Sequence, residues 1–188
     1  MAGEAGWAEA LTGQVRLADG TSVTIRPIRP GDLCQHADFV HGLSPRTGYM
    51  RLLSARVPQD DELRRMTQID YPAELALVAV ATVDGREVEV GVARYAPTVD
   101  ADAPPGRAEF AIVLSDAWQG RGLARQLLGR LVDAAAAAGV RELADITLYD
   151  NAAMIALARK LGFTVQRDPG DAKIRLLRKL LQPPTPLR

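Results

Sequence analysis

The chain has 188 residues, equal numbers of acidic and basic side chains, and a formal net charge of zero. This length suits one domain with its own hydrophobic core. The balanced charge argues against a nucleic-acid-binding protein, because such proteins carry a basic excess. No apolar run reaches the roughly 20 residues that a membrane-spanning helix needs, so we expect neither nucleic acid nor membrane as a partner.

The single cysteine, Cys34, excludes an internal disulfide and a cysteine-rich metal site. His36 and His41 are five residues apart, which is not the i, i+4 spacing of a paired metal site on a helix, so no metal is expected. The N-terminal residues lack the basic start and the apolar segment of a signal peptide. The simplest expectation is therefore a reducing, cytoplasmic location.

The predicted domain boundaries lie near the two ends of the chain. We expect a flexible N-terminus over residues 1–13, a single domain over 14–181, and a disordered tail over 182–188. The tail contains three prolines, which disfavour regular structure there.

The first quarter of the domain predicts a hairpin followed by helices. Two β-rich runs around an Asp-Gly pair predict a hairpin over 15–28. Residues 32–43 have helical spacing, and Ser44 is a cap signal for a second helix. The acidic start of 60–69 predicts a third, short helix.

The middle of the chain predicts strands. Three apolar runs follow one another at 74–83, 89–97 and 108–115. Tight or irregular loops join them, which favours antiparallel pairing.

The last third alternates between helix and strand. An amphipathic helix is predicted over 122–138 and a second helix over 152–161, with a strand over 142–149 between them. A final pair of strands is predicted over 163–167 and 173–180. Because a strand–helix–strand unit of this kind makes one parallel crossover, the whole reads as a mixed α/β domain.

The loop before the longest helix has the features of an anion site. Gly120 and Gly122 flank an arginine immediately before the helix start. A helix N-terminus carries unpaired N–H groups and a partial positive charge, and glycines let a phosphate approach the backbone without meeting a Cβ. Gln119, Arg121 and Arg125 can add side-chain donors.

Several ligands compete for this loop on the residues alone. A Walker loop is excluded, because no Gly-Lys-Ser/Thr is present. The dinucleotide fingerprint G-x-G-x-x-G has Arg125 at its sixth position, and the preceding sheet reads as antiparallel. The pyrophosphate of coenzyme A is the third candidate, and a tight strand–helix turn without a ligand is the fourth.

The segment from "AEFAIVLS" through "LGFTV" closely resembles the acetyl-CoA-binding core of the GCN5-related N-acetyltransferases (GNAT). The family's loop, Q/R-x-x-G-x-G/A, corresponds to "QGRGLA" over 119–124, and its later landmarks correspond to Asn151 and Gly162-Phe163. Upstream, "VTIRPIRPGDL", "GLSPRTGYMRLLS" and "GVARY" resemble the acetyltransferase domain of bacterial protein lysine acetyltransferases. The likeness covers about residues 20–180.

The resemblance implies the fold and a site for acetyl-CoA as co-substrate. The implied fold is the GNAT fold: an α/β (α+β) domain with a mixed, mostly antiparallel sheet, helices on both faces, and a splayed central strand pair. Backbone groups of the splayed strand would pair with the pantetheine arm, the loop would hold the pyrophosphate, and the asparagine would hold the pantetheine or a nearby water. The implied cofactor-binding residues are Ile112, Val113, Leu114, Gln119, Gly120, Arg121, Gly122, Leu123, Ala124 and Asn151.

Glu109 is the candidate catalytic residue. An exposed lysine amine has a pKa near about 10.4, so transfer of an acetyl group to it needs a base. Glu109 lies in an otherwise apolar strand, where a partly desolvated cleft would raise its pKa, and "AEFA" matches the catalytic Glu of the protein-acetylating subgroup. Two positions depart from the family: Asp116 replaces a frequent proline, and Ala158 replaces the tyrosine that protonates the departing thiolate in many members.

The function expected from these residues is transfer of acetyl from acetyl-CoA to a lysine amine of a protein, for instance an acyl-CoA synthetase. A small-molecule amine is the alternative acceptor, and a non-catalytic acyl-CoA sensor is the alternative to an enzyme. The acceptor half is expected in the helices of 32–66 and the loop 97–107. We expect a monomer or a homodimer.

Overall fold

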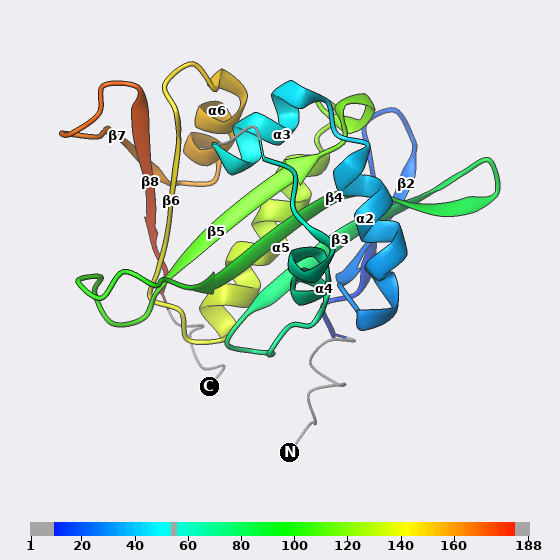
Figure 1. Ribbon diagram of the computed structural model, residues 1–188, viewed down its shortest axis with the longest axis horizontal. Helices are drawn as coiled ribbons and strands as arrows, with labels where there is room; N and C mark the ends of the chain where they lie inside the picture. Colours follow the sequence, from blue (N-terminus) through cyan, green and yellow to red (C-terminus); the bar gives the residue numbers. More distant parts are fainter. Residues whose placement is uncertain (1–9, 54–55, 183–188) are drawn as a thin grey trace.

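The computed structural model describes residues 10–53 and 56–182 (Figure 1). In chain order the elements are β1 (Gly13–Arg16), β2 (Ser22–Pro27), η1 (Pro30–Asp32), α2 (Leu33–His41), α3 (Pro45–Leu52), α4 (Asp60–Thr67), β3 (Leu75–Val83), β4 (Arg86–Pro97), β5 (Arg107–Leu114), η2 (Asp116–Trp118), α5 (Leu123–Ala137), β6 (Glu142–Leu148), α6 (Ala152–Lys160), β7 (Thr164–Arg167) and β8 (Ile174–Leu180). The predicted elements are all present, with ends shifted by a few residues.

The strands form one sheet in the order β1-β2-β3-β4-β5-β6-β8-β7 within the described residues. All neighbouring strands are antiparallel except β5 and β6, which are parallel. Helix α5 makes the crossover between these two strands. The expected mixed, mostly antiparallel sheet with one parallel crossover is therefore confirmed.

Helices cover both faces of the sheet (Figure 1). Strand β3 is apolar throughout because both of its faces are covered. Its odd-numbered residues from Leu75 to Ala81 belong to the core beneath α5, whereas Ala76, Val78 and Val80 belong to a second core with Phe39 of α2. A strand covered on both faces loses the polar alternation of a half-exposed strand. The apolar side of α5 packs into the first core, as the spacing of its leucines predicts.

Strands β5 and β6 pair over only three residues and then separate. Arg107, Ala108 and Glu109 lie opposite residues 142–144, whereas β5 continues to Leu114 without further pairing to β6. In Figure 1 the two strands diverge from a common lower end, and β6 runs away to join β8. The expected splayed central pair is therefore confirmed.

A buried ion pair fastens the closed end of this gap. Arg107 donates from Nε to Glu142 Oε2 at 2.8 Å, and the two side chains are 14% and 11% exposed. This largely buried pair links the two strands at the end where they still pair, and the separation begins two residues beyond Arg107.

Most of the expected flexible terminus (1–13) and of the expected tail (182–188) lies outside the described residues. Strand β1 already begins at Gly13, one residue before the predicted domain boundary. Among the described residues, no helix has both the length and the apolar character needed to cross a membrane.

Candidate functional site

The glycine loop between β5 and α5 has the backbone shape that the sequence predicts. Gly120 and Gly122 have φ values of +74° and +87°, in the left-handed region that favours glycine. No atom lies within 4 Å of the position that a Cβ would take at either residue. The loop therefore presents open space directly above its peptide groups.

The peptide N–H groups of this loop point at that space without partners. Within the described residues, none of the N–H groups from Gly120 to Arg125 donates to a protein acceptor, and the first helical bond is from Gln126 N to Gly122 O at 3.4 Å. Consecutive unpaired donors at the start of a 15-residue helix attract an anion through both hydrogen bonding and the helix dipole. The site fits the pyrophosphate that the resemblance implies.

The neighbouring polar side chains are mainly used to hold the loop. Arg121 donates to Asp19 in the β1–β2 turn, with 2.8 Å between Nε and Oδ2, and its guanidinium lies 4.5 Å from the ring centroid of Trp118. Gln119 donates from Nε2 to Leu114 O at 3.2 Å and to Thr47 Oγ1 at 3.3 Å. The donors left open to an anion are therefore backbone groups rather than these side chains.

The open edge of β5 supplies a second row of unpaired backbone groups. Ser115 N donates to Val90 O on β4, and in an antiparallel ladder the residues that face one neighbour alternate with those that face the other. The N–H and C=O of Ile112 and the N–H of Leu114 consequently face the gap left by β6, whereas the Leu114 C=O accepts from Gln119 Nε2 and the groups of Val113 face β4. An extended pantetheine chain can pair with this edge as an added strand would.

Asn151 occupies the N-cap of α6. Its Oδ1 accepts from Met154 N at 3.2 Å, and its Nδ2 donates to Thr147 Oγ1 at 3.0 Å. The side chain therefore caps α6. These two bonds fix the side-chain amide at the β6 side of the gap.

Glu109 lies where β5 and β6 begin to separate, but its surroundings differ from those expected. The expectation of a desolvated carboxylate is wrong, because Glu109 is exposed. Thr98 Oγ1 donates to Glu109 Oε1 at 2.7 Å and orients the carboxylate.

Asp145 is a second carboxylate that sequence reasoning missed. It lines the same cavity of about 250 Å³ as Glu109, between β5, β6 and β8. Burial raises the pKa of Asp145 to about 7, an effect that the Ile146 N–H and the charge of Arg51 partly oppose. The site thus contains a carboxyl group that titrates near neutral pH.

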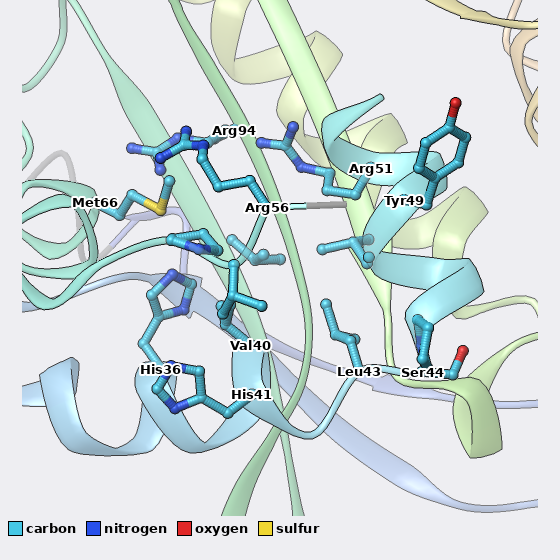
Figure 2. Close-up of a pocket in the computed structure, with 16 residues that line it drawn as sticks. His36, Val40, His41, Leu43, Ser44, Tyr49, Arg51, Arg56, Met66 and Arg94 are labelled. Carbon is cyan, nitrogen blue, oxygen red and sulfur yellow. The ribbon is translucent and has the colours of Figure 1, made fainter. Parts of the chain in front are cut away.

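A larger pocket lies on the face covered by α2, α3 and α4. It has a volume of about 500 Å³, and apolar side chains of β4, β5 and the helices form most of its wall. Figure 2 shows Arg51, Arg56 and Arg94 gathered at the top of the view and His36 and His41 at the bottom left. Most of its lining residues fall within 32–66, the segment expected to bind the acceptor, and that role stays a prediction; the sequence did not single out these arginines.

Helix α3, which contributes part of this pocket, is tied directly to the glycine loop. Asp116 accepts from Thr47 Oγ1 and from Ser44 Oγ, each at 2.9 Å, and from Ser44 N at 3.3 Å. The Thr47 and Ser44 hydroxyls hold the pKa of Asp116 below its ordinary value. Asp116, which stands where the family often has proline, is therefore bonded to the N-cap residue and the first turn of α3.

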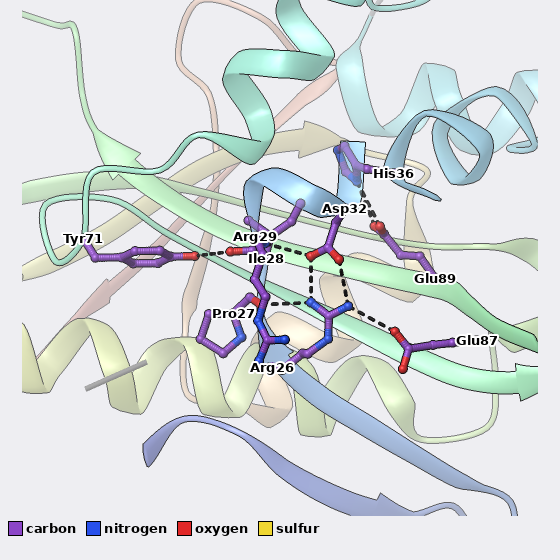
Figure 3. A network of polar contacts seen from close by, with 9 residues as sticks. All are labelled: Arg26, Pro27, Ile28, Arg29, Asp32, His36, Tyr71, Glu87 and Glu89. Carbon is purple, nitrogen blue, oxygen red and sulfur yellow. Dashed lines mark hydrogen bonds and ion pairs between the residues drawn. The ribbon is translucent and has the colours of Figure 1, made fainter. Parts of the chain in front are cut away.

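A polar network anchors α2 on the other side of the pocket (Figure 3). His36 Nδ1 contacts Glu89 Oε1 at 2.9 Å, with both side chains almost fully buried. Arg26 is held by Asp32 in a two-bond pair at 2.7 and 2.9 Å and by Glu87 at 3.1 Å. These contacts fix the end of β2 and the start of α2 relative to β4, so the pocket wall is rigid on that side.

Comparisons with known proteins agree with this geometry. A sequence model of the Acetyltransferase (GNAT) family matches residues 46–163. The chain is 36% identical over 167 residues to Acetyltransferase PA5475 of Pseudomonas aeruginosa, covering 88% of this chain and 84% of that protein. It is 30% identical over 148 residues to Acetyltransferase Pat of Mycolicibacterium smegmatis, covering 79% of this chain but only 43% of that longer protein.

Solved structures show the same fold. The GNAT domain of S. lividans PAT aligns with a TM-score of 0.79 at 29% identity, over 92% of this chain and 98% of that one. The yncA acetyltransferase of Salmonella typhimurium, solved with its cofactor acetyl-CoA, aligns with a TM-score of 0.69 at 22% identity, over 88% and 98% of the two chains.

The fold, the glycine loop and these matches define an enzyme of the acyltransferase class. The chain belongs to the GNAT family. It is an acetyl-CoA-dependent acetyltransferase.

The raised pKa of Asp145 predicts a pH-dependent stability. An unfolded aspartate titrates near about 3.9, so between this pH and about 7 the folded chain retains a proton that the unfolded chain has released. Stability from this group should therefore fall as the pH rises through that window. Asp145→Asn should melt at a higher temperature than the wild type at pH values above about 7, with a smaller difference near pH 5.

Thermal melts of both proteins across this pH range provide the measurement, with Asp133→Asn on the exposed side of α5 as the control. A difference between the two proteins that does not grow as the pH rises from about 4 to about 7 would contradict the raised pKa of Asp145.

Proposed function

We propose that this enzyme transfers the acetyl group of acetyl-CoA to a lysine side-chain amine of a protein, for instance an acyl-CoA synthetase, in the cytoplasm. One observation carries the proposal. Unpaired backbone N–H groups at the α5 N-terminus and along the open edge of β5 line one gap, and the carboxyl groups of Glu109 and Asp145 share a cavity at its closed end. The likeness of the upstream half to bacterial protein lysine acetyltransferases supports a protein acceptor.

In this proposal the cofactor runs along the gap between β5 and β6. The N–H groups of Gly120 to Ala124 bind its pyrophosphate. The backbone of Ile112 and Leu114 pairs with the pantetheine arm, and Asn151 holds that arm or a water beside it. The thioester then lies near the closed end of the gap, where Glu109 is placed.

The chemical step is a direct attack. Glu109 takes a proton from the lysine ammonium, and the freed amine nitrogen attacks the thioester carbonyl. A new C–N bond forms, the C–S bond breaks, and the second proton released by the amine nitrogen passes to the departing thiolate to give the amide and coenzyme A. A backbone N–H on the open edge of β5 is available to polarise the thioester carbonyl, because it faces the gap.

A small-molecule amine is the second candidate acceptor. The pocket of about 500 Å³ supports it, since a concave pocket of this size suits a small ligand better than a flat protein surface. A non-catalytic acyl-CoA sensor is the weakest alternative, because the chain is a GNAT acetyltransferase and retains Glu109.

Substitution of the proposed base should separate chemistry from binding. We expect Glu109→Gln to lower kcat/KM at least about tenfold while the affinity for CoA stays unchanged, because the substitution removes only the proton acceptor. The measurement is CoA release in steady state together with calorimetric titration of CoA. Asp100→Asn, which removes a charge from the same cavity, is the matched control and should retain activity.

An unchanged rate in Glu109→Gln would remove this residue from the role of base. If Asp145→Asn instead loses the rate, and with it the rise in activity toward neutral pH, the base is Asp145.

Labelled acetyl-CoA tests the acceptor class. After incubation of the enzyme with a cell lysate, we expect label on protein lysines, mapped by mass spectrometry, and no label with Glu109→Gln. Label found only in the low-mass fraction would replace the protein acceptor by the small amine.

A further inference from the structure

Two arginines from different elements line the pocket of about 500 Å³ between α2, α3, β4 and β5, here called the acceptor pocket. Arg94 projects from the central strand β4, and Arg51 projects from α3 above the splayed strands. Both side chains are half-buried, and Figure 2 shows them near one another at the same end of the pocket. The rest of the wall is mainly apolar, with Val92 and Val113 forming its floor.

Neither guanidinium group has a partner within the described part of the chain. No hydrogen bond or ion pair joins Arg51 or Arg94 to any protein group there. Arg26, by contrast, is an arginine with a structural role: it donates two hydrogen bonds to Asp32, one to Glu87 and one to the Pro27 carbonyl. Removing a cation from water without such partners lowers the stability of the fold. The fold alone therefore does not explain why two partly buried arginines lie here.

The charges that face these arginines do not neutralise them. Glu74 attracts Arg94 and Asp145 attracts Arg51, but neither carboxylate forms an ion pair with a described residue, and the two arginines repel one another. Burial lowers the pKa of both guanidinium groups, and it raises the pKa of Asp145 to about 7, so this carboxylate is only partly ionised near neutral pH. The pocket is left with an excess of positive charge.

We propose that Arg51 and Arg94 form a carboxylate-binding subsite, so that the preferred acceptor is an amine that also carries a carboxylate. The inference rests on the proposed acetyl transfer and narrows its substrate class. A guanidinium presents paired N–H donors that match the two oxygens of a carboxylate. The apolar wall favours an acceptor with an apolar portion between or beside its charged groups. The carboxylate can belong to a free amino acid or to an acidic residue that flanks a lysine in a protein.

Matched acceptors test the subsite. We expect the wild type to acetylate L-leucine with a kcat/KM at least about tenfold above that for L-leucinamide if the acceptor is small, and to prefer a Glu-Lys peptide over its Gln-Lys counterpart by a similar factor if it is a peptide. Arg94→Gln and Arg51→Gln should each abolish the preference and leave the uncharged acceptor within about threefold of the wild-type value. Arg64→Gln, on the exposed side of α4, is the control.

Two further readouts separate this role from a structural one. If the arginines serve a ligand rather than the fold, Arg94→Gln should melt at the same temperature as the wild type or higher. If no acceptor is acetylated at all, the proposed transfer fails, and the subsite is then judged by calorimetry of N-acetyl-L-leucine against its amide in the presence of CoA. Equal acceptance of charged and uncharged probes by the wild type, or a preference that survives in both variants, overturns the subsite.

Discussion

The separation of β5 from β6 is the constraint on which the rest of this structure depends. A continuous sheet would pair the backbone of Ile112 and Leu114 with the next strand, but here pairing ends at Glu109. Unpaired backbone groups are unfavourable unless water or a ligand satisfies them. The fold thus keeps an edge open in the middle of its sheet, at the point where a crossover helix also begins with free N–H groups.

The elements around the gap hold it in one shape. The ion pair of Arg107 and Glu142 fixes the closed end, Gln119 bonds to the end of β5, and Asp116 joins the loop to α3. Helix α3 also carries Arg51. It therefore contacts both the loop proposed to bind the cofactor and the pocket proposed to bind the acceptor. Displacing this helix is therefore expected to affect both halves of the reaction.

The distribution of charge separates residues that serve the fold from those that serve a ligand. Arg26 and His36 form hydrogen bonds to carboxylates at the start of α2 and on β4, and these bonds position α2. Among the residues that the structure describes, Arg51 and Arg94 form no hydrogen bond or ion pair, and burial keeps Asp145 partly protonated. Partly buried charges without partners lower the stability of the folded state. Such destabilising residues are typical of functional sites.

Local signals in the sequence predicted much of this site. The two glycines before the longest helix predicted a loop open to an anion, and the amphipathic run over 122–138 predicted α5. Each of these features depends on a few neighbouring residues.

What the sequence missed depends on residues that are distant in the chain. The exposure of Glu109 follows from how far β6 moves away, and the raised pKa of Asp145 follows from what buries it. Arg51 and Arg94 come from a helix and a strand, and nothing in either segment alone indicates that they face one pocket. The family resemblance allowed residues to be named for the cofactor site but only segments for the acceptor site. Side chains from several elements form the acceptor site, so no single segment reveals it.

Amide NMR during a titration with CoA tests the central claim most directly. The account predicts that the amide signals of Gly120 to Arg125, with those of Ile112 and Leu114, shift as CoA binds, while the signals of β7 stay in place. Shifts confined to other parts of the chain, or no shifts at saturating CoA, would contradict it.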